Sequence, residues 1–267
     1  MIFFPTAKIN IGLNILEKRN DGFHNLNTIF YPINLSDVVE FTENNKNQYL
    51  FFNTGIKINL KSIEDNLLIK AYNILKKDFE LPYIDVHLHK IIPIGAGLGG
   101  GSSDAAFMLK SINSYFKLNI SNNELANYAQ ELGSDCNFFI SNKPVFACEK
   151  GNILQDINFD LKGYYIAVIY PGININTAKA YSLITPVKPK QSLYDLIKLP
   201  INEWKNFIYN DFEKIIFPMY PVIEDIKIKL YNSGAIYSSM SGSGSAVFGI
   251  FEKQIEIKNY FENFFVW

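Results

Sequence analysis

The stretch from Pro93 to Ala106 contains the residue types that could bind a phosphate. It reads Pro-Ile-Gly-Ala-Gly-Leu-Gly-Gly-Gly-Ser-Ser-Asp-Ala-Ala, with five glycines in seven positions. Residues 105–116 then place apolar side chains at helical spacing, so the glycines lead directly into a helix. Backbone N–H groups without shielding side chains, together with the positive end of the helix dipole, favour an anion at such a place. We therefore predict a cradle for the phosphates of a nucleotide.

Three better-known glycine loops fit this stretch less well. A P-loop needs a lysine where Gly101 stands. The spacing Gly95-x-Gly97-x-x-Gly100 matches the dinucleotide fingerprint, but Pro93 interrupts the junction and no convincing βαβ unit precedes it. A protein-kinase loop would be followed by His-Arg-Asp and Asp-Phe-Gly motifs, which the sequence lacks. A flexible linker or a close helix–strand turn remains the structural alternative.

A cation and a carboxylate stand out in other segments. Residues 8–16 alternate between apolar and polar, so Lys8 and Asn10 share one face of a predicted strand. That face could hold a polar substrate, or it could simply be solvated. Asp135 follows a predicted helix and precedes the apolar run Phe138–Ile140, which places a carboxylate where the chain enters the core. Asp135 either has a charged partner or caps the next element.

Several ring residues have both a functional and a structural interpretation. His24 follows a predicted turn and could contact a ligand, although a lone histidine there is more often only exposed. Tyr181 could stack on a base or fill the core. His87 and His89 share a strand face, but the sequence shows no third ligand near them, so we predict no metal site.

Composition bounds the class of protein. The chain has 267 residues, of which 48% are hydrophobic, and a net charge of −1. It can bury a substantial core, and nothing in its overall charge favours nucleic acid or an anionic membrane. Its two cysteines cannot form a disulfide framework, and no apolar run reaches transmembrane length. We expect a cytoplasmic protein that binds neither nucleic acid nor membrane.

Periodicity and turn signals predict the elements that must position these residues. Strands are expected at 8–16, 24–33, 37–42, 49–53, 56–60, 83–92, 144–149, 163–170 and 246–251. Helices are expected at 67–79, 102–116, 121–132, 177–183, 210–217, 221–232 and 254–264, with weak helicity from residue 192. Thr177 is expected to cap its helix, and a domain boundary is expected near 150–162.

Three segments together resemble, in order and spacing, the motifs of the GHMP small-molecule kinases: Pro5–Asn10, Pro93–Ala106 and Ser241–Ser245. Asp21–His24 and Gly133–Phe139 are similar to members that act on a cytidine-diphosphate alcohol. The resemblance spans nearly the whole chain. It implies an α+β, two-domain GHMP kinase fold. An S5-like N-terminal domain, residues 1–152, would bind ATP and carry the catalytic residues, and a ferredoxin-like C-terminal domain, residues 153–267, would bind substrate.

The resemblance also implies roles for individual residues. Lys8 and Asp135 would be the catalytic pair of an ATP-dependent kinase that uses Mg2+. Residues near ATP would be Asn66, Lys90, Pro93, Gly95, Ala96, Gly97, Leu98, Gly99, Gly100, Gly101, Ser102 and Ser103. Residues around the cytidine-diphosphate substrate would be Asn10, Phe23, His24, Thr177 and Tyr181, with Phe23 and Tyr181 enclosing the cytosine ring. Asp104 and the Ser102 and Ser103 hydroxyls are candidate magnesium ligands, or Asp104 stabilises the helix start.

The chain departs from the family pattern at two places. Phe23 stands where the family usually has tyrosine, and Cys136-Asn137 replaces the common Val-Pro. The alternatives are a kinase for another small alcohol, of the mevalonate or homoserine type, and a nucleotide-binding regulator without catalysis. His24 and Tyr181 argue against the first, and the intact pair of Lys8 and Asp135 argues against the second. We expect a monomer or a weak homodimer.

Overall fold

The computed structural model of this protein describes residues 1–59 and 61–267. Their contacts divide the chain into two compact units that interleave in sequence. Unit 1 comprises Met1–Lys8, Pro32–Ile94 and Gly99–Lys143, and unit 2 comprises Ile9–Tyr31, Gly95–Leu98 and Pro144–Trp267. The linear division into residues 1–152 and 153–267 groups the chain differently, and it stays a prediction.

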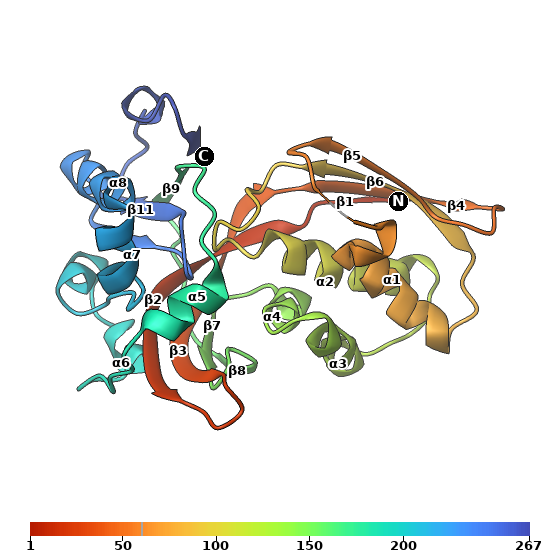
Figure 1. Ribbon diagram of the computed structural model, residues 1–267, viewed down its shortest axis with the longest axis horizontal. Coiled ribbons are helices and arrows are strands. Elements are labelled where there is room, and N and C mark those ends of the chain that lie inside the picture. The colour runs from red at the N-terminus through yellow and green to blue at the C-terminus, as the bar shows by residue number, and fades with distance from the viewer. Residues whose placement is uncertain (60) are drawn as a thin grey trace. The chain divides into compact units, whose positions relative to one another are not determined.

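Unit 1 is built from one sheet and four helices (Figure 1). The sheet has the order β1 (Ile2–Phe3), β4 (Val38–Asn44), β6 (Tyr83–Lys90) and β5 (Leu50–Gly55), and only the β5–β6 pair is parallel. The helices lie along one face of it: α1 (Leu67–Asp78), α2 (Gly100–Tyr115), α3 (Asn122–Leu132) and α4 (Cys136–Ser141). Alternation along β6 buries Ile84, Val86 and Leu88, as the pattern predicts.

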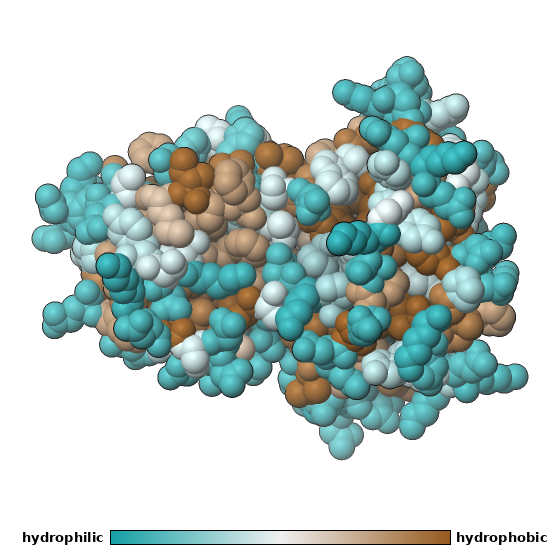
Figure 2. Space-filling view, turned by 180° about the vertical axis from the view of Figure 1, so that it is seen from behind, coloured by the Kyte–Doolittle hydropathy of each residue, from teal (hydrophilic) through white to brown (hydrophobic). Residues whose placement is uncertain are grey.

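The other face of this sheet carries a mixed row of side chains. Ile2 pairs with Glu40, Glu40 with His87, and His87 with Phe52, so these four residues lie side by side. Ile2 and Phe52 are more than half exposed. Figure 2 shows one side of the molecule, where hydrophilic residues cover much of the surface and hydrophobic residues gather in patches between them.

Caps fix the helix starts in unit 1. The side-chain oxygen of Asn66 accepts the N–H of Leu68 at 2.8 Å and begins α1. Ser121 and Glu124 form the predicted capping box of α3. Helix α2 starts two residues before the predicted position, because Gly99 takes the left-handed conformation at its N-cap with φ +72°.

Two four-stranded sheets belong mainly to unit 2. One has the order β2 (Thr6–Lys18), β3 (His24–Ser36), β7 (Val145–Cys148) and β8 (Ile153–Asp156), and β2 and β3 begin or end in unit 1. The predicted turn at Asp21-Gly22 joins β2 to β3. The other is antiparallel, with the order β10 (Tyr237–Met240), β11 (Val247–Phe251), β9 (Tyr165–Tyr170) and β12 (Phe265–Val266).

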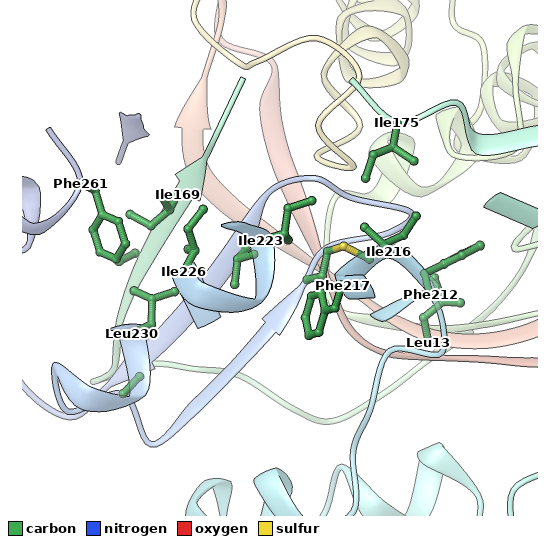
Figure 3. Packing of buried hydrophobic residues seen from close by; sticks show 14 of the residues in the cluster. Leu13, Ile169, Ile175, Phe212, Ile216, Phe217, Ile223, Ile226, Leu230 and Phe261 are labelled. Atoms are coloured by element: carbon green, nitrogen blue, oxygen red, sulfur yellow. The ribbon is translucent and has the colours of Figure 1, made fainter. Parts of the chain in front are cut away.

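The helices of unit 2 include α5 (Thr177–Leu183), α6 (Leu193–Leu196), α7 (Glu213–Met219) and α8 (Pro221–Asn232). Buried residues of α5, α7 and α8 form one core cluster with residues of the antiparallel sheet. Figure 3 shows Ile223, Ile226 and Leu230 of α8 beside Ile169 of β9, in a cluster that also includes Leu13 of β2. The helix predicted at 221–232 is therefore α8, and Ile223, Ile226 and Leu230 form its buried face.

Four further local predictions are wrong. Residues 56–59 form no strand, because the N–H of Ile58 turns back to the side chain of Asn53; residue 60 lies outside the described residues. The helix expected at 254–264 shrinks to a 3-10 turn, Lys258–Tyr260, because Phe265 and Val266 pair with β9 instead.

The remaining two concern helix starts. The helix expected at 210–217 begins at Glu213, because the side chain of Asn210 accepts the N–H of Phe212 in a local turn. Asn176, not Thr177, caps α5 by accepting the N–H of Lys179. Among the described residues, no helix is long and apolar enough to cross a membrane.

The core of unit 2 predicts a contrast between two positions of α8. Leu230 is fully buried, whereas Ile228 is 49% exposed. We expect Leu230→Ala to lower the free energy of unfolding by about 2–5 kcal/mol, because it removes buried methyl groups and leaves a cavity. Ile228→Ala should change it by less than about 0.5 kcal/mol. Urea unfolding measures both, and equal losses would contradict the assignment of the buried face.

Candidate active site

Lys8 and Asp135 lie together within unit 1. Lys8 stands near the start of β2, and its Nζ is 3.5 Å from Oδ2 of Asp135. Asp135 occupies the N-cap position of α4, but its side chain makes no capping hydrogen bond. Of the two sequence interpretations, the structure therefore supports the charged partner. The Lys8 side chain is 4% exposed and that of Asp135 is 36% exposed, so the carboxylate remains within reach of a ligand.

Burial dominates the electrostatics of Lys8. It lowers the pKa of the Lys8 ammonium, and the attraction and hydrogen bond of Asp135 oppose that change. An unpaired ammonium at this depth would be costly, so the carboxylate is needed to keep it charged. The pair thus places a fixed cation directly behind a partly exposed carboxylate.

The second half of the glycine stretch packs against this pair. A Cβ at Gly99 would lie 2.9 Å from Cζ of Phe139 and 3.2 Å from Cε of Lys8. A Cβ at Gly100 would lie 2.9 Å from Cγ2 of Ile92. Because these glycines lack side chains, the first turn of α2 can lie close to Lys8. The glycine pattern alone did not predict this contact.

The first half of the stretch packs against the Gly/Ser loop within unit 2. The hydroxyl of Ser241 donates to the carbonyl of Gly97 at 2.9 Å, and the N–H of Ala246 donates to the carbonyl of Ala96 at 3.1 Å. A Cβ at Gly97 would lie 2.0 Å from the Ser241 carbonyl oxygen. Two small-residue segments that are far apart in sequence thus touch through their backbones. The loop, Ser241–Ser245, is also the turn between the paired strands β10 and β11.

Asn10 belongs to the same network. Its backbone N–H donates to Oγ of Ser241 at 3.2 Å, and its amide donates to Oγ1 of Thr28 at 3.0 Å. Asn210, which sequence reasoning missed, donates from its amide to the carbonyls of Met240 and Gly242. No sequence signal marks Asn210, because its role depends on a loop about thirty residues away.

His24 and Tyr181 face each other within unit 2. Their ring centroids are 5.1 Å apart with an interplanar angle of 20°, and Tyr181 also meets the edge of Phe212. Burial lowers the pKa of His24, with a further contribution from Lys18, so the imidazole is mainly neutral at pH 7. Two residues predicted for the substrate site are therefore in direct contact.

The other residues predicted for the substrate lie in the same unit. Phe23 is 58% exposed, and the Lys150 ammonium lies 4.9 Å from its ring centroid. The structure thus stacks His24 on Tyr181, whereas the sequence resemblance pairs Tyr181 with Phe23 across a bound base. The hydroxyl of Thr177 lies 2.9 Å from that of Ser243, which connects α5 to the Gly/Ser loop.

Residues predicted near the adenine have strong local partners in unit 1. Asn66 caps α1 with its side-chain oxygen. Lys90 is 3% exposed, and its Nζ lies 2.5 Å from Oδ2 of Asp37 and 2.7 Å from Oδ2 of Asp104. Asp37 could not be predicted from the sequence pattern, because its partners Lys90, Ile91 and Ile92 lie at the end of another strand.

The candidate magnesium ligands stand in the first turns of α2. Asp104 is buried against Lys90, and burial is the main reason that its pKa rises to about 8. This carboxyl does not fit a solvent-accessible metal ion. Ser102 is half-buried and hydrogen-bonds the thiol of Cys136, whereas Ser103 is fully buried. Within residues 1–59 and 61–267, no group of three His, Cys, Asp or Glu side chains could hold a metal ion.

Comparisons with known proteins give a consistent result. The GHMP kinases N-terminal domain model matches residues 66–143, and the GHMP kinases C-terminal model matches residues 193–266. A 4-diphosphocytidyl-2-C-methyl-D-erythritol kinase of Bacteroides fragilis is 51% identical over 96% of this chain and 94% of its own length. One of the same name from Parabacteroides distasonis is 49% identical over 100% of this chain and 98% of its own.

A solved structure supports the same fold. The crystal structure of a 4-(cytidine 5'-diphospho)-2C-methyl-D-erythritol kinase superposes with a TM-score of 0.79, at 28% identity, over 94% of this chain and 90% of that one. These matches confirm the predicted fold class, α+β with N-terminal and C-terminal GHMP kinase domains.

Two glycines of the stretch should respond oppositely to alanine. Gly99 has a positive φ and a crowded Cβ position, so Gly99→Ala should lower the free energy of unfolding by about 1–2 kcal/mol from backbone conformation alone. Gly101 lies in the first turn of α2, where a Cβ would meet only Cδ1 of Leu67 at 3.5 Å. Gly101→Ala should raise the stability by about 0.4–1 kcal/mol. Urea unfolding of both variants is the measurement, and a tolerated Gly99→Ala would contradict the described backbone.

Proposed function

Because the chain belongs to the GHMP kinase family, we propose that it transfers the γ-phosphoryl group of ATP to the 2-hydroxyl of 4-diphosphocytidyl-2-C-methyl-D-erythritol, in non-mevalonate isoprenoid precursor biosynthesis. The observation that carries the proposal is the near full-length identity with kinases of that name. The pairing of Lys8 with Asp135 supports a catalytic role for this chain, since a carboxylate held by a buried cation suits proton transfer.

Asp135 is proposed to accept the proton of the acceptor hydroxyl. The acceptor oxygen forms a bond to the γ-phosphorus, the bond from that phosphorus to the bridging oxygen breaks, and ADP leaves. Lys8 holds the carboxylate in place and offsets its charge. Phosphoryl transfer asks little covalent chemistry of the protein, so alignment of the two reactants is the larger contribution, about 7–11 kcal/mol in favourable cases.

The glycine stretch is proposed to bind the phosphates of ATP. Gly99 is the N-cap of α2, and no side chain caps the N–H groups of the first helical turn, so these groups are the proposed donors to an anion. Pro93–Ser103 would line this cradle, with Asn66 and Lys90 toward the adenine. The side chains of Asn66 and Lys90 already have strong hydrogen-bond or ionic partners. They would therefore shape the adenine pocket by packing rather than by hydrogen bonds to the base.

Unit 2 is proposed to bind the cytidine-diphosphate end of the substrate. Asn10, Phe23, His24, Thr177 and Tyr181 would contact it. The ring of Tyr181 already stacks on His24, which holds it in one orientation. An exposed Phe23 retains a face for the cytosine ring but lacks the hydroxyl of the tyrosine that is usual in the family.

Three further features belong to the proposal. Mg2+ would accompany ATP and would neutralise charge on its phosphates. Because magnesium keeps several waters and binds substrate phosphates, it would take most of its ligands from ATP and water. The half-buried Ser102 hydroxyl is the candidate ligand from α2. Both cysteines are free, which suits a cytoplasmic protein, and we propose a monomer or a weak homodimer.

An assay of ATP consumption with the cytidyl alcohol, and with mevalonate and homoserine as alternative acceptors, tests the reaction. Asp135→Asn should bind ATP and acceptor with nearly unchanged affinity but lower kcat about 10²-fold or more, because the amide cannot accept the proton. Glu131→Gln, an exposed change on α3, is the control and should leave kcat unchanged. Near-normal turnover of Asp135→Asn would remove Asp135 from the role of base.

Substrate choice predicts a second contrast. Tyr181→Ala should weaken binding of the cytidyl alcohol about tenfold or more, since stacking of a base on an aromatic ring is worth about 1–3 kcal/mol. ATP affinity should change little, and Tyr181→Phe should be mild because it keeps the ring. Titration of each ligand against the folded variants is the measurement. Equal losses for ATP and the cytidyl alcohol would mean that Tyr181 serves only the core, where it packs against Phe212.

A further inference from the structure

Asp37 is a fully buried carboxylate of unit 1, and it lies between the end of β3 and the start of β4. Its Oδ1 accepts the N–H groups of Ile91 and Ile92 at 2.5 and 2.9 Å, and its Oδ2 lies 2.5 Å from Nζ of Lys90. Three consecutive residues at the exit of β6 are therefore held by one side chain. These residues lead directly into Pro93 and the glycine stretch.

Lys90 extends this contact to the other end of the glycine stretch. Its Nζ lies 2.7 Å from Oδ2 of Asp104, in the second turn of α2. A Cβ at Gly100 would lie only 3.0 Å from the same ammonium, so α2 begins directly over it. Asp37, Lys90 and Asp104, which we call the buried triad, thus connect residues 90–92 with residues 100–104.

Asp37 also contacts the segment that carries the catalytic lysine. Its backbone N–H donates to the carbonyl of Pro5 at 3.0 Å, three residues before Lys8. One residue therefore contacts the start of β2, the end of β6 and, through Lys90, the start of α2. All of these contacts lie within unit 1.

We infer that Asp37 is a positioning residue for nucleotide binding, which acts through the buried triad by fixing the spacing between the β6 exit and the first turns of α2. The inference rests on the proposed function only in taking ATP as the ligand of the glycine stretch. Asp37 is 0% exposed, so it cannot contact ATP itself.

The cost of burying charge indicates that the triad positions the backbone and does not only stabilise the fold. Buried ion pairs and triads can often be replaced by packed apolar residues without loss of stability, because desolvation offsets the attraction. Apolar replacements, however, would leave the N–H groups of Ile91 and Ile92 without their acceptor, and buried N–H groups need one. The specific contribution of Asp37 is therefore to hold the backbone of Ile91 and Ile92 in place.

Asp37→Asn is the discriminating variant. It keeps the shape and leaves Lys90 paired with Asp104, but a single amide oxygen cannot accept two N–H groups and also face an ammonium as the carboxylate does. We expect the KM and the Kd for ATP to rise about tenfold at a temperature where the variant is fully folded. The KM for the cytidyl alcohol should stay within about twofold of the unaltered protein.

Asp211→Asn is the matched control. Asp211 is also a buried carboxylate that accepts a backbone N–H, from Ile15 at 2.9 Å, and pairs with a lysine, Lys214. It belongs to unit 2, whereas all three residues of the triad belong to unit 1. Asp211→Asn should lower the melting temperature but leave the affinity for ATP within about twofold.

Calorimetric titration of ATP without acceptor separates this inference from the proposed function. If ATP binding weakens in Asp37→Asn and not in Asp211→Asn, the inference stands even where the cytidyl alcohol is not the acceptor. If Asp37→Asn loses thermal stability and its folded form binds ATP as the unaltered protein does, the triad is only structural and the inference is wrong. Equal weakening in both variants would also overturn it, because the effect would then follow from any buried carboxylate.

Discussion

A lysine ammonium that is withdrawn from water needs a carboxylate, and unit 1 meets this requirement twice. Lys8 has one partner, Asp135, which remains 36% exposed. Lys90 has two partners, Asp37 and Asp104, which are both almost fully buried. The same pairing of charges therefore gives two outcomes. Where the carboxylate reaches the surface it is available for chemistry, and where it is enclosed it can only hold backbone and helix in place.

Small residues are the second constraint, because they decide how closely backbones approach one another. The glycine stretch contacts Lys8 and Phe139 in unit 1 through Gly99, and the Gly/Ser loop in unit 2 through Gly97. A side chain at either position would separate these partners. The missing side chains of the stretch therefore bring together parts of the chain that are distant in sequence.

Much of the fold could be predicted from local patterns. The helices α1 and α8, the capping box of α3 and the turn at Asp21-Gly22 each follow from residues close together in sequence. The end of the chain could not, because its buried Ile257 and Phe261 have helical spacing while Phe265 and Val266 pair with a distant strand. The short strands β1 and β8 were missed for the same reason, since pairing rather than pattern defines them.

The site divides in a similar way. Residue type and spacing marked Lys8, Asp135 and the glycines only as candidates, and the family resemblance supplied the roles predicted for Lys8 and Asp135. Asp37 and Asn210 could not, because each acts through backbone groups of other elements. The contact between His24 and Tyr181 also escaped prediction, since more than 150 residues separate them and only the fold brings them together.

The interleaving of the two units has a consequence for how such a protein can change. The core of unit 2 combines Leu13, Ile15 and Leu26 with residues of α7, α8 and the antiparallel sheet. A fragment that begins at residue 153 would lack these three side chains and expose the surface they cover. A single crossover in the gene would therefore transfer unit 2 without part of its hydrophobic core. Because the chain passes back and forth between the two units, we expect both units to be inherited together.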